Sequence, residues 1–165
     1  MDVPVTQAVR LLRQRGIAFT PHFYTYEEHG GTRHAADSLG IDEHAVVKTL
    51  VFQTDGREPL LVLMHGDREV STRRIARTLG VKHVVPCDVA TAQRHTGYTV
   101  GGISPFAPRS PLPVYVERTI LDLPRIYLNG GKRGFLVGVD PSVVTAVLDA
   151  TPVDAAVEVE TPRAG

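Results

Sequence analysis

The chain is organised around one glycine- and proline-rich segment, Thr96-Gly97-Tyr98-Thr99-Val100-Gly101-Gly102-Ile103-Ser104-Pro105-Phe106. The β-prone run 98–100 predicts a short strand, and the glycine pair after it permits positive φ angles and close approach of another group. Pro105 fixes its own φ and favours an extended residue before it. We therefore expect a strand that ends in a stiff loop, whose free N–H groups suit a carbonyl or an anion. A plain corner between two strands is the alternative.

The composition is that of an ordinary globular domain. The chain has 165 residues, of which 42% are apolar and 22% charged, which suits one domain with one core. No apolar run approaches the ~20 residues of a membrane helix. Residues 1–15 lack the apolar core of a signal peptide, so we expect a cytoplasmic protein without membrane contact. Cys87 is the only cysteine, which excludes an internal disulfide and fits a reducing compartment.

The charges balance. Lys+Arg and Asp+Glu both number 18, whereas a general nucleic-acid binder is usually basic. Any contact with nucleic acid must therefore use a local patch. The densest basic segment, residues 68–82, carries Arg73, Arg74 and Arg77 on one face of a predicted helix, where they could meet phosphates. A solvated helix face is the alternative.

Helices and strands are interspersed along the chain. Hydrophobic periodicity, caps and turn residues predict helices at 2–16, 33–39, 71–79, 88–97 and 140–149. β-rich runs predict strands at 48–53, 60–64, 81–85, 114–117, 126–128, 135–139 and 153–159, the first two joined as a hairpin through Asp55-Gly56. This mixture predicts an α+β fold around a mixed sheet, with one domain over residues 1–160 and a tail at 161–165.

Three strand ends carry groups suited to chemistry. Lys48 begins an apolar strand, and the glycine pairs 101–102 and 130–131 each follow a predicted strand. If these ends converge, an ammonium and backbone N–H groups would face each other across one cleft and bind a polarised carbonyl or a terminal ribose. The alternative for Lys48 is a rim lysine that reaches to water. Ser104 lacks the Gly-x-Ser-x-Gly frame of a nucleophile, so attack should come from water or from the substrate.

The seven histidines are scattered in the sequence, without a His-x-His or His-x-x-x-His pair. This spacing predicts no metal site, and nothing else in the sequence indicates a cofactor. We expect His22, His65 and His95 to be structural or surface residues rather than catalysts.

Three motifs occur in a characteristic order: Val47-Lys48-Thr49-Leu50, then Thr96-Gly97-Tyr98-x-Val100-Gly101-Gly102-Ile103-Ser104-Pro105, then Gly130-Gly131-Lys132-Arg133-Gly134. Together they resemble the YbaK/EbsC family of aminoacyl-tRNA deacylases, which is related to the editing insertion domain of bacterial prolyl-tRNA synthetase. The resemblance runs from about Ala8 to Leu148. It implies a single α+β domain with a curled mixed sheet and flanking helices, free-standing in the cytoplasm.

The resemblance also implies an activity. Such proteins remove an amino acid wrongly esterified to tRNA, most often cysteine from Cys-tRNA(Pro), with alanine or serine as other candidates. The thiol of the substrate cysteine attacks the ester in YbaK-like members, and water attacks in relatives that clear alanine or serine. The implied partners are mischarged tRNA and prolyl-tRNA synthetase, and we expect a monomer or weak homodimer without a metal or cofactor.

Roles carry over by position onto this sequence. The resemblance implies catalytic roles for Lys48, Gly101 and Gly102. It implies contacts with the substrate for Tyr24, Thr49, Tyr98, Ser104, Pro105, Asn129 and Gly131. We add a tRNA-binding role for Arg73, Arg74, Arg77, Lys132 and Arg133. Two positions depart from YbaK-like members, which have serine at Asn129 and aspartate at Leu136, so the specificity for cysteine is open.

Two other functions compete with the deacylase hypothesis. The lost aspartate at Leu136 and the arginine face favour a non-catalytic module that binds tRNA ends or prolyl-tRNA synthetase. A hydrolase that acts on a small ester or amide, without tRNA, is the third hypothesis.

Overall fold

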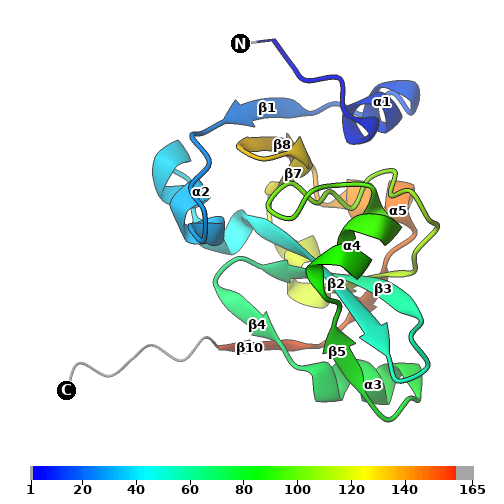
Figure 1. Ribbon diagram of the computed structural model, residues 1–165. Helices are drawn as coiled ribbons and strands as arrows, with labels where there is room; N and C mark the ends of the chain where they lie inside the picture. The colour runs from blue at the N-terminus through cyan, green and yellow to red at the C-terminus, as the bar shows by residue number, and fades with distance from the viewer. Residues whose placement is uncertain (1, 159–165) are drawn as a thin grey trace.

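The computed structural model describes residues 2–158, in which five α-helices, two 3-10 helices and ten strands are found (Figure 1). The helices are α1 (Gln7–Gln14), α2 (Gly31–Leu39), η1 (Glu43–Ala45), α3 (Thr72–Leu79), α4 (Val89–Thr96), η2 (Arg118–Asp122) and α5 (Ser142–Leu148). The strands are β1 (Thr20–Phe23), β2 (Val47–Thr54), β3 (Pro59–His65), β4 (Arg68–Val70), β5 (Val84–Pro86), β6 (Val114–Glu117), β7 (Ile126–Lys132), β8 (Phe135–Val139), β9 (Thr151–Val153) and β10 (Ala156–Glu158). The predicted tail at 161–165 lies outside the described residues.

The strands form three sheets. The largest is mixed, with the order β5-β2-β3-β6-β9: β2 is antiparallel to β3 and β5, whereas β6 is parallel to both β3 and β9. A second, antiparallel sheet has the order β1-β8-β7, and β4 pairs with β10 in the third. Figure 1 shows β7 and β8 at one end of the molecule and α3 with β5 at the other. The predicted α+β class with a mixed sheet is confirmed.

The two larger sheets meet where β2 begins. Val46, the residue before β2, forms an isolated parallel bridge with Tyr127 of β7. Lys48 and Asn129 each lie two residues beyond this bridge, on strands that leave it in the same direction. The strand that carries Lys48 therefore lies beside the strand that leads into the second glycine pair.

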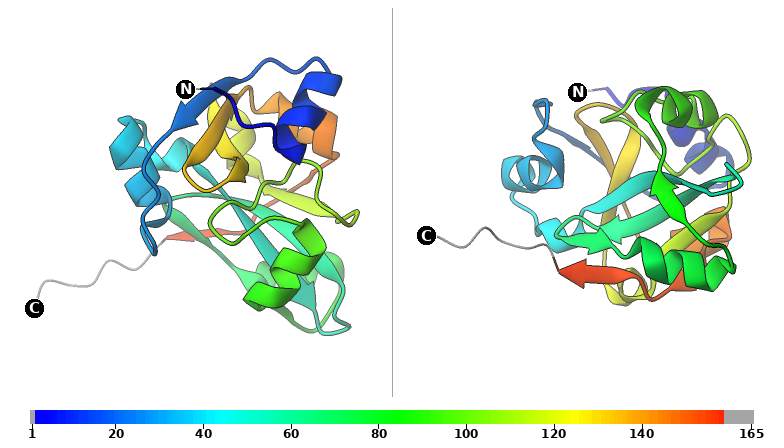
Figure 2. Two further views of the ribbon diagram at one scale, coloured as in Figure 1. Left: turned by 45° about the horizontal axis from the view of Figure 1, so that its top comes forward. Right: turned by 60° about the horizontal axis from the view of Figure 1, so that its bottom comes forward.

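β3 is buried on both faces. Leu61 and Leu63 belong to the main core, which includes residues of α1, β7, β8 and α5. Leu60, Val62 and Met64 point to the other face, where α3 closes a second core. A third cluster packs α2 against β8 and the start of β2. In Figures 1 and 2, α2 stands at the periphery of the molecule, on the side opposite α5.

The structure confirms the predicted turn at Asp55-Gly56 and the predicted caps of α3. β2 and β3 form an antiparallel hairpin around Asp55-Gly56, in which Val47 pairs with His65. In α3 the Ser71 side chain accepts the Arg74 N–H, and Gly80 ends the helix in the left-handed region at φ 71°.

Residues 98–100 do not form the predicted strand. Gly97 ends α4 at φ 77°, and Tyr98 then turns into the core, where its hydroxyl donates to Phe106 O at 2.6 Å. The Val100 N–H donates to the Gln93 side chain of α4 at 3.0 Å. The segment is thus held as a turn against α4, because burial of one aromatic ring outweighs the β propensity of the run.

The chain ends of the domain also differ from the prediction. α1 begins at Gln7 and not near Pro4, because the Thr6 hydroxyl accepts the Val9 N–H at 3.1 Å and donates to Gly130 O of β7. The predicted strand 153–159 is two short strands, β9 and β10, and Val159 lies outside the described residues. No helix between residues 2 and 158 combines the length and apolarity that crossing a membrane requires.

Candidate active site

The first glycine pair, Gly101-Gly102, lies in a tight turn that packs against the β7–β8 hairpin. Gly101 is exposed at φ 94°, whereas Gly102, Ser104 and Pro105 are buried. The Gly102 N–H donates to Thr99 O at 2.8 Å. This amide is therefore not free, contrary to expectation, because the turn uses its N–H to close on itself.

Asn129 joins the two glycine loops. Its Nδ2 donates to Gly101 O at 3.1 Å, while its Oδ1 accepts the N–H groups of Gly131 at 2.7 Å and Lys132 at 3.1 Å. The side chain thus satisfies the bulge at the end of β7 and holds the first loop against it. Three of the predicted site residues, Gly101, Asn129 and Gly131, are brought together by this one amide.

The contact between the loop and the hairpin leaves no space for a side chain. A Cβ on Gly102 would lie 2.8 Å from the backbone nitrogen of Arg133 and 2.9 Å from the carbonyl carbon of Lys132. A Cβ on Gly101 would lie 2.8 Å from the Tyr26 hydroxyl oxygen. Glycine is therefore required at Gly102 for a steric reason, because its obstacles are backbone atoms, whereas at Gly101 the obstacle is the end of a side chain and the positive φ is what favours glycine.

Arg133, at the tip of the β7–β8 hairpin, also holds the first glycine loop against the hairpin. Its Nε donates to Val100 O at 2.9 Å, and its guanidinium carbon lies 4.8 Å from the centroid of the Tyr26 ring. Lys132 and Arg133 are both exposed at the hairpin tip. A pocket of ≈ 330 Å³ lies between this tip and the N-terminal segment, lined by Asp2, Pro4, Phe23, Tyr24, Thr25, Lys132, Arg133, Gly134 and Phe135. Neither Lys48 nor Gly101 lines this pocket.

Lys48 is half-buried near the start of β2. Burial lowers the pKa of its ammonium, and the carboxylates of Glu69, Glu43 and Asp67 oppose that shift. The charges that act on it thus come from β4, η1 and the turn after β3. On the neighbouring strand β7, Asn129 lies at the same distance from the Val46–Tyr127 bridge as Lys48 does on β2, and Asn129 bonds both glycine loops. That the ammonium faces the Gly101 loop across one cleft stays a prediction.

Of two further predicted residues, Thr49 lies within β2 and Tyr24 packs near the start of that strand. The Thr49 hydroxyl oxygen is the buried side-chain polar atom of residues 2–158 that has no hydrogen-bond partner. An unpaired group of this kind costs about 1–3 kcal/mol, so a ligand that bonds it would gain from doing so. Tyr24 packs under α2 in the cluster that contains Leu136, which is paired with Asn129 across β7 and β8. An apolar side chain therefore fills the position that is aspartate in YbaK-like proteins.

Tyr98, Ser104 and Pro105 lie inside the loop rather than on its surface. Tyr98 is 8% exposed and Ser104 is fully buried, with its Oγ accepting the Phe106 N–H at 3.2 Å. Burial raises the pKa of Tyr98 to about 12, so its phenol stays protonated and keeps its bond to Phe106 O. Any effect of these residues on a substrate would act through the shape of the loop.

Neither Cys87 nor Ser104 is suited to attack an ester. Burial raises the pKa of the Cys87 thiol, and the charge of Asp88 raises it further. The Cys87 sulfur lies 3.7 Å from the Gln53 side chain, at the β5 side of the sheet. This is consistent with the expectation that water or the substrate supplies the nucleophile.

The predicted tRNA-binding arginines of α3 are exposed. Arg74 Nη1 lies 3.4 Å from Ala156 O and 4.0 Å from the Asp154 carboxylate. Among the ion pairs of residues 2–158, none includes Arg73 or Arg77. These two guanidinium groups are therefore available to an anionic partner.

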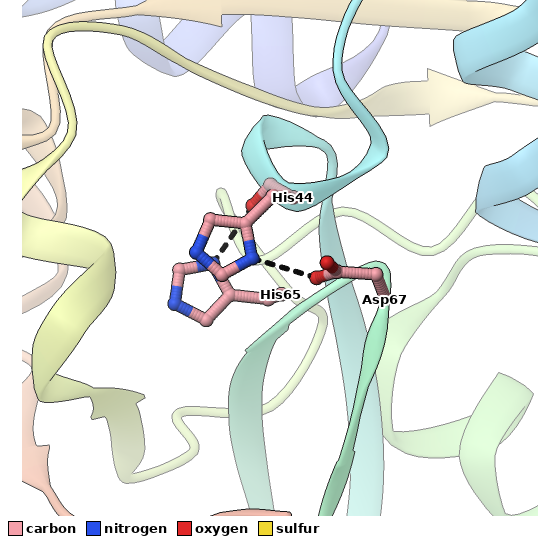
Figure 3. Close-up of side chains that lie close together, drawn as sticks. All are labelled: His44, His65 and Asp67. Carbon is pink, nitrogen blue, oxygen red and sulfur yellow. Dashed lines mark hydrogen bonds and ion pairs between the residues drawn. The ribbon is translucent and has the colours of Figure 1, made fainter. Parts of the chain in front are cut away.

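A cluster that was not predicted is formed by His44, His65 and Asp67, whose ligand atoms lie within 4.8 Å of one another (Figure 3). The two rings are stacked, with centroids 3.7 Å apart and planes 7° from parallel. An imidazole binds a metal ion in the plane of its ring at about 2.0–2.1 Å. One ion cannot lie in two parallel planes this far apart, so the cluster as arranged does not form a metal site.

Solved structures share this fold. A crystal structure described provisionally as that of a trans-editing enzyme for prolyl-tRNA synthetase matches 94% of this chain and 99% of its own, with a TM-score of 0.80 and 22% sequence identity. The fold of this protein is therefore that of a single α+β domain, which it shares with this crystal structure.

The sequence comparisons identify the family. The aminoacyl-tRNA editing domain family matches residues 27–146, and the chain belongs to this family. EbsC of Enterococcus faecalis, provisionally named a Cys-tRNA(Pro)/Cys-tRNA(Cys) deacylase, is 26% identical over 143 residues, which cover 86% of this chain and 87% of EbsC. A proline–tRNA ligase of Desulfotalea psychrophila is 33% identical over 99 residues, which are 60% of this chain but 17% of the ligase. The resemblance drawn from the three motifs is confirmed.

Proposed function

We propose that this chain is a deacylase that removes wrongly attached amino acids from tRNA in trans. The proposal rests on the family match over residues 27–146 together with the junction at Asn129, which ties Gly101 to the second glycine loop. Cys-tRNA(Pro) is the first substrate to test, because EbsC, a relative that aligns over 86% of this chain and 87% of its own, is named for it. Ala-tRNA(Pro) and Ser-tRNA(Pro) follow.

The chemistry needs no nucleophile from the protein. Water, or the thiol of an esterified cysteine, attacks the acyl carbon; the bond from that carbon to the ribose oxygen breaks, and the ribose oxygen takes the proton from the attacking group. Negative charge develops on the carbonyl oxygen during attack, and hydrogen-bond donors placed beforehand stabilise it. We assign this role to the Gly101 N–H and the unpaired Thr49 hydroxyl, with the Lys48 ammonium holding the terminal adenosine or the ester.

Two exposed basic surfaces would hold the tRNA. Arg73 and Arg77 on α3 would meet phosphates of the acceptor stem. At the other end, Lys132 and Arg133 stand beside the aromatic side chains of Phe23 and Tyr24. Cations next to aromatic rings are the usual means of holding single-stranded nucleic acid, which is the form of the 3′ end of tRNA.

Leu136 supports a second candidate, a module that binds tRNA ends or prolyl-tRNA synthetase without turnover. An apolar side chain there removes a carboxylate from the region of Tyr24 and Asn129. The arginine face of α3 would serve this function equally well.

The test is release of labelled amino acid from Cys-, Ala- and Ser-tRNA(Pro) by the wild-type chain at micromolar concentration. The proposal expects at least one substrate to be cleared well above its spontaneous rate. If all three survive while the chain binds tRNA in a salt-dependent way, the binding module is correct. Equal turnover of a free aminoacyl ester and its tRNA-linked form would instead indicate a small-ester hydrolase.

A further inference from the structure

A chain of hydrogen bonds runs from η1 through the end of β3 and η2 to β6, with His65 and Glu117 buried and Thr119 exposed. His65 is 1% exposed; its Nδ1 lies 2.7 Å from His44 O, and its Nε2 lies 2.7 Å from the Thr119 hydroxyl oxygen. The same hydroxyl lies 2.8 Å from Oε2 of Glu117, which is also 1% exposed. Figure 3 shows the His65 ring beneath that of His44, with its second nitrogen directed away from Asp67.

The protons in this chain can be counted from its donors and acceptors. A carbonyl oxygen only accepts, so His65 Nδ1 must carry a hydrogen to bond His44 O. The Thr119 hydroxyl has one hydrogen, which can go to Glu117 or to His65 Nε2 but not to both.

Both arrangements of the Thr119 hydroxyl hydrogen lead to the same number of protons on His65, Thr119 and Glu117. If the hydroxyl donates to a Glu117 carboxylate, then His65 Nε2 must donate to the hydroxyl, and the ring is an imidazolium. If the hydroxyl donates to the ring, then Glu117 must be protonated in order to donate to the hydroxyl. Both arrangements hold one proton more than a neutral ring beside a carboxylate.

We propose that His65, Thr119 and Glu117 form a proton-binding relay, which holds one proton at neutral pH and thereby locks η1 onto the sheet. Its middle member, Thr119, is exposed, so the relay can exchange its proton with water. Transfer is balanced within the relay: the His65 Nε2–H and Thr119 O–H bonds break as hydrogens move to Thr119 and Glu117, and the ring is left neutral.

The relay ties together segments that are distant in the sequence. The second oxygen of Glu117 accepts the N–H groups of Ala155 at 2.8 Å and Ala156 at 2.9 Å, which fixes the turn between β9 and β10. At the other end, His44 O lies in η1, which leads directly into the start of β2 and Lys48. A proton bound in this relay therefore steadies the segment that positions Lys48.

The titratable and charged groups around His65 come from η1, the β3–β4 turn, β4 and β6. The His44 ring of η1 stacks on it and hydrogen-bonds Asp67 of the β3–β4 turn at 2.7 Å, and Arg68 bonds the other Asp67 oxygen at 3.0 Å. Burial is the largest effect on His65 and holds its pKa below the ordinary value; the His44 carbonyl, Asp67 and Glu117 raise it in part, and the His44 ring lowers it further. Burial raises the pKa of Glu117, but hydrogen bonds from the N–H groups of Ala155, Thr119 and Ala156 and from the Thr119 hydroxyl outweigh burial and leave that pKa lowered.

The hydrogen-bond geometry opposes both of these shifts. With a neutral ring and an ionised Glu117, the Thr119 hydroxyl can donate its one hydrogen to only one of them, so the other acceptor would face the hydroxyl oxygen at 2.7 or 2.8 Å with no hydrogen between them. When the proton leaves as the pH rises, one of the three contacts must therefore break. The lock on η1 is thus present at low and neutral pH and is lost at high pH.

The test is NMR of the whole chain with ¹⁵N-labelled histidine and ¹³C-labelled glutamate carboxyl groups. At pH 7 we expect either both ring nitrogens of His65 protonated with Glu117 ionised, or Nδ1 alone protonated with Glu117 as a carboxylic acid. A ring protonated on one nitrogen beside an ionised Glu117 would overturn the proposal. This outcome is read on the wild-type protein and does not depend on deacylase activity.

Variants supply the control. In Glu117→Gln the amide NH₂ can donate to Thr119, whose hydroxyl then donates to a neutral His65, so the extra proton should be lost and His65 should titrate at least about one pH unit lower. Glu69→Gln, which neutralises an exposed carboxylate on β4, should leave His65 unchanged. If Glu117→Gln folds and His65 titrates as in wild type, the relay does not exist.

Discussion

Gly102→Ala is expected to separate the first glycine loop from the β7–β8 hairpin. The new Cβ would lie 2.8 Å from the backbone nitrogen of Arg133, and ordinary contact begins at 3.4 Å, so the two segments must move apart by about 0.6 Å. Both obstacles, at Arg133 and Lys132, are backbone atoms, so a side-chain rotation cannot relieve the contact. Overpacking of this kind costs about 1–3 kcal/mol of folding free energy.

The same shift should slow catalysis, because it moves Gly101 relative to Asn129. Misplacement by about 1 Å can cost about 100-fold in rate, so a movement of this size should cost roughly tenfold. Denaturant unfolding and single-turnover deacylation measure the two effects. Gly56→Ala is the matched control, since its Cβ would meet nothing closer than the Thr54 hydroxyl at 3.6 Å. A Gly102→Ala variant as stable and as active as wild type would show that the loop does not pack on the hairpin as described.

Three further predictions concern the site. Because burial lowers the pKa of Lys48, deacylation that needs its ammonium should fall as the pH rises through this lowered pKa. Lys48→Arg should abolish this loss of activity at alkaline pH, since arginine stays charged. A pH–rate profile that the substitution leaves unchanged would show that deacylation does not need the Lys48 ammonium. Asn129→Ala should cost about 0.5–1.5 kcal/mol in denaturant unfolding, since it removes three hydrogen bonds and water can solvate the exposed groups of Gly101 and Lys132, while Asn129→Ser should recover part of the loss. Arg73→Glu with Arg77→Glu should weaken tRNA binding and lower the slope of log K against log salt by about 2, without changing the rate at saturating tRNA; an unchanged slope would place the tRNA elsewhere.

The fold was largely predictable because local signals agree with the tertiary structure. The Asp55-Gly56 turn, the Ser71 cap and Gly80 each act on their immediate neighbours, and each has its predicted effect. The strand predicted at 98–100 was wrong because the structure of this run depends on where the Tyr98 ring is buried, and the core around that ring is built from distant elements.

The histidine cluster was missed although a signal existed. A hairpin centred on Asp55-Gly56 places residue 47 opposite residue 65, and therefore brings the segment just before β2 close to the end of β3. His44 and His65 are neighbours for this reason. By contrast, the Asn129 contact with Gly101 joins residues 28 apart through a side chain, and no local pattern announces it.

The most direct test of the central claim is single-turnover deacylation of Cys-tRNA(Pro), Ala-tRNA(Pro) and Ser-tRNA(Pro) at saturating enzyme, comparing wild type with Lys48→Ala and with Lys82→Ala. Lys82 is an exposed lysine in the loop after α3 and serves as the control. We predict that wild type and Lys82→Ala release the amino acid from at least one tRNA at the same rate, and that Lys48→Ala is at least about 100-fold slower, the loss expected when the group that positions the ester is removed and the ester shifts by about 1 Å. Equal rates for all three proteins, or no release by any, would contradict an active site built around Lys48.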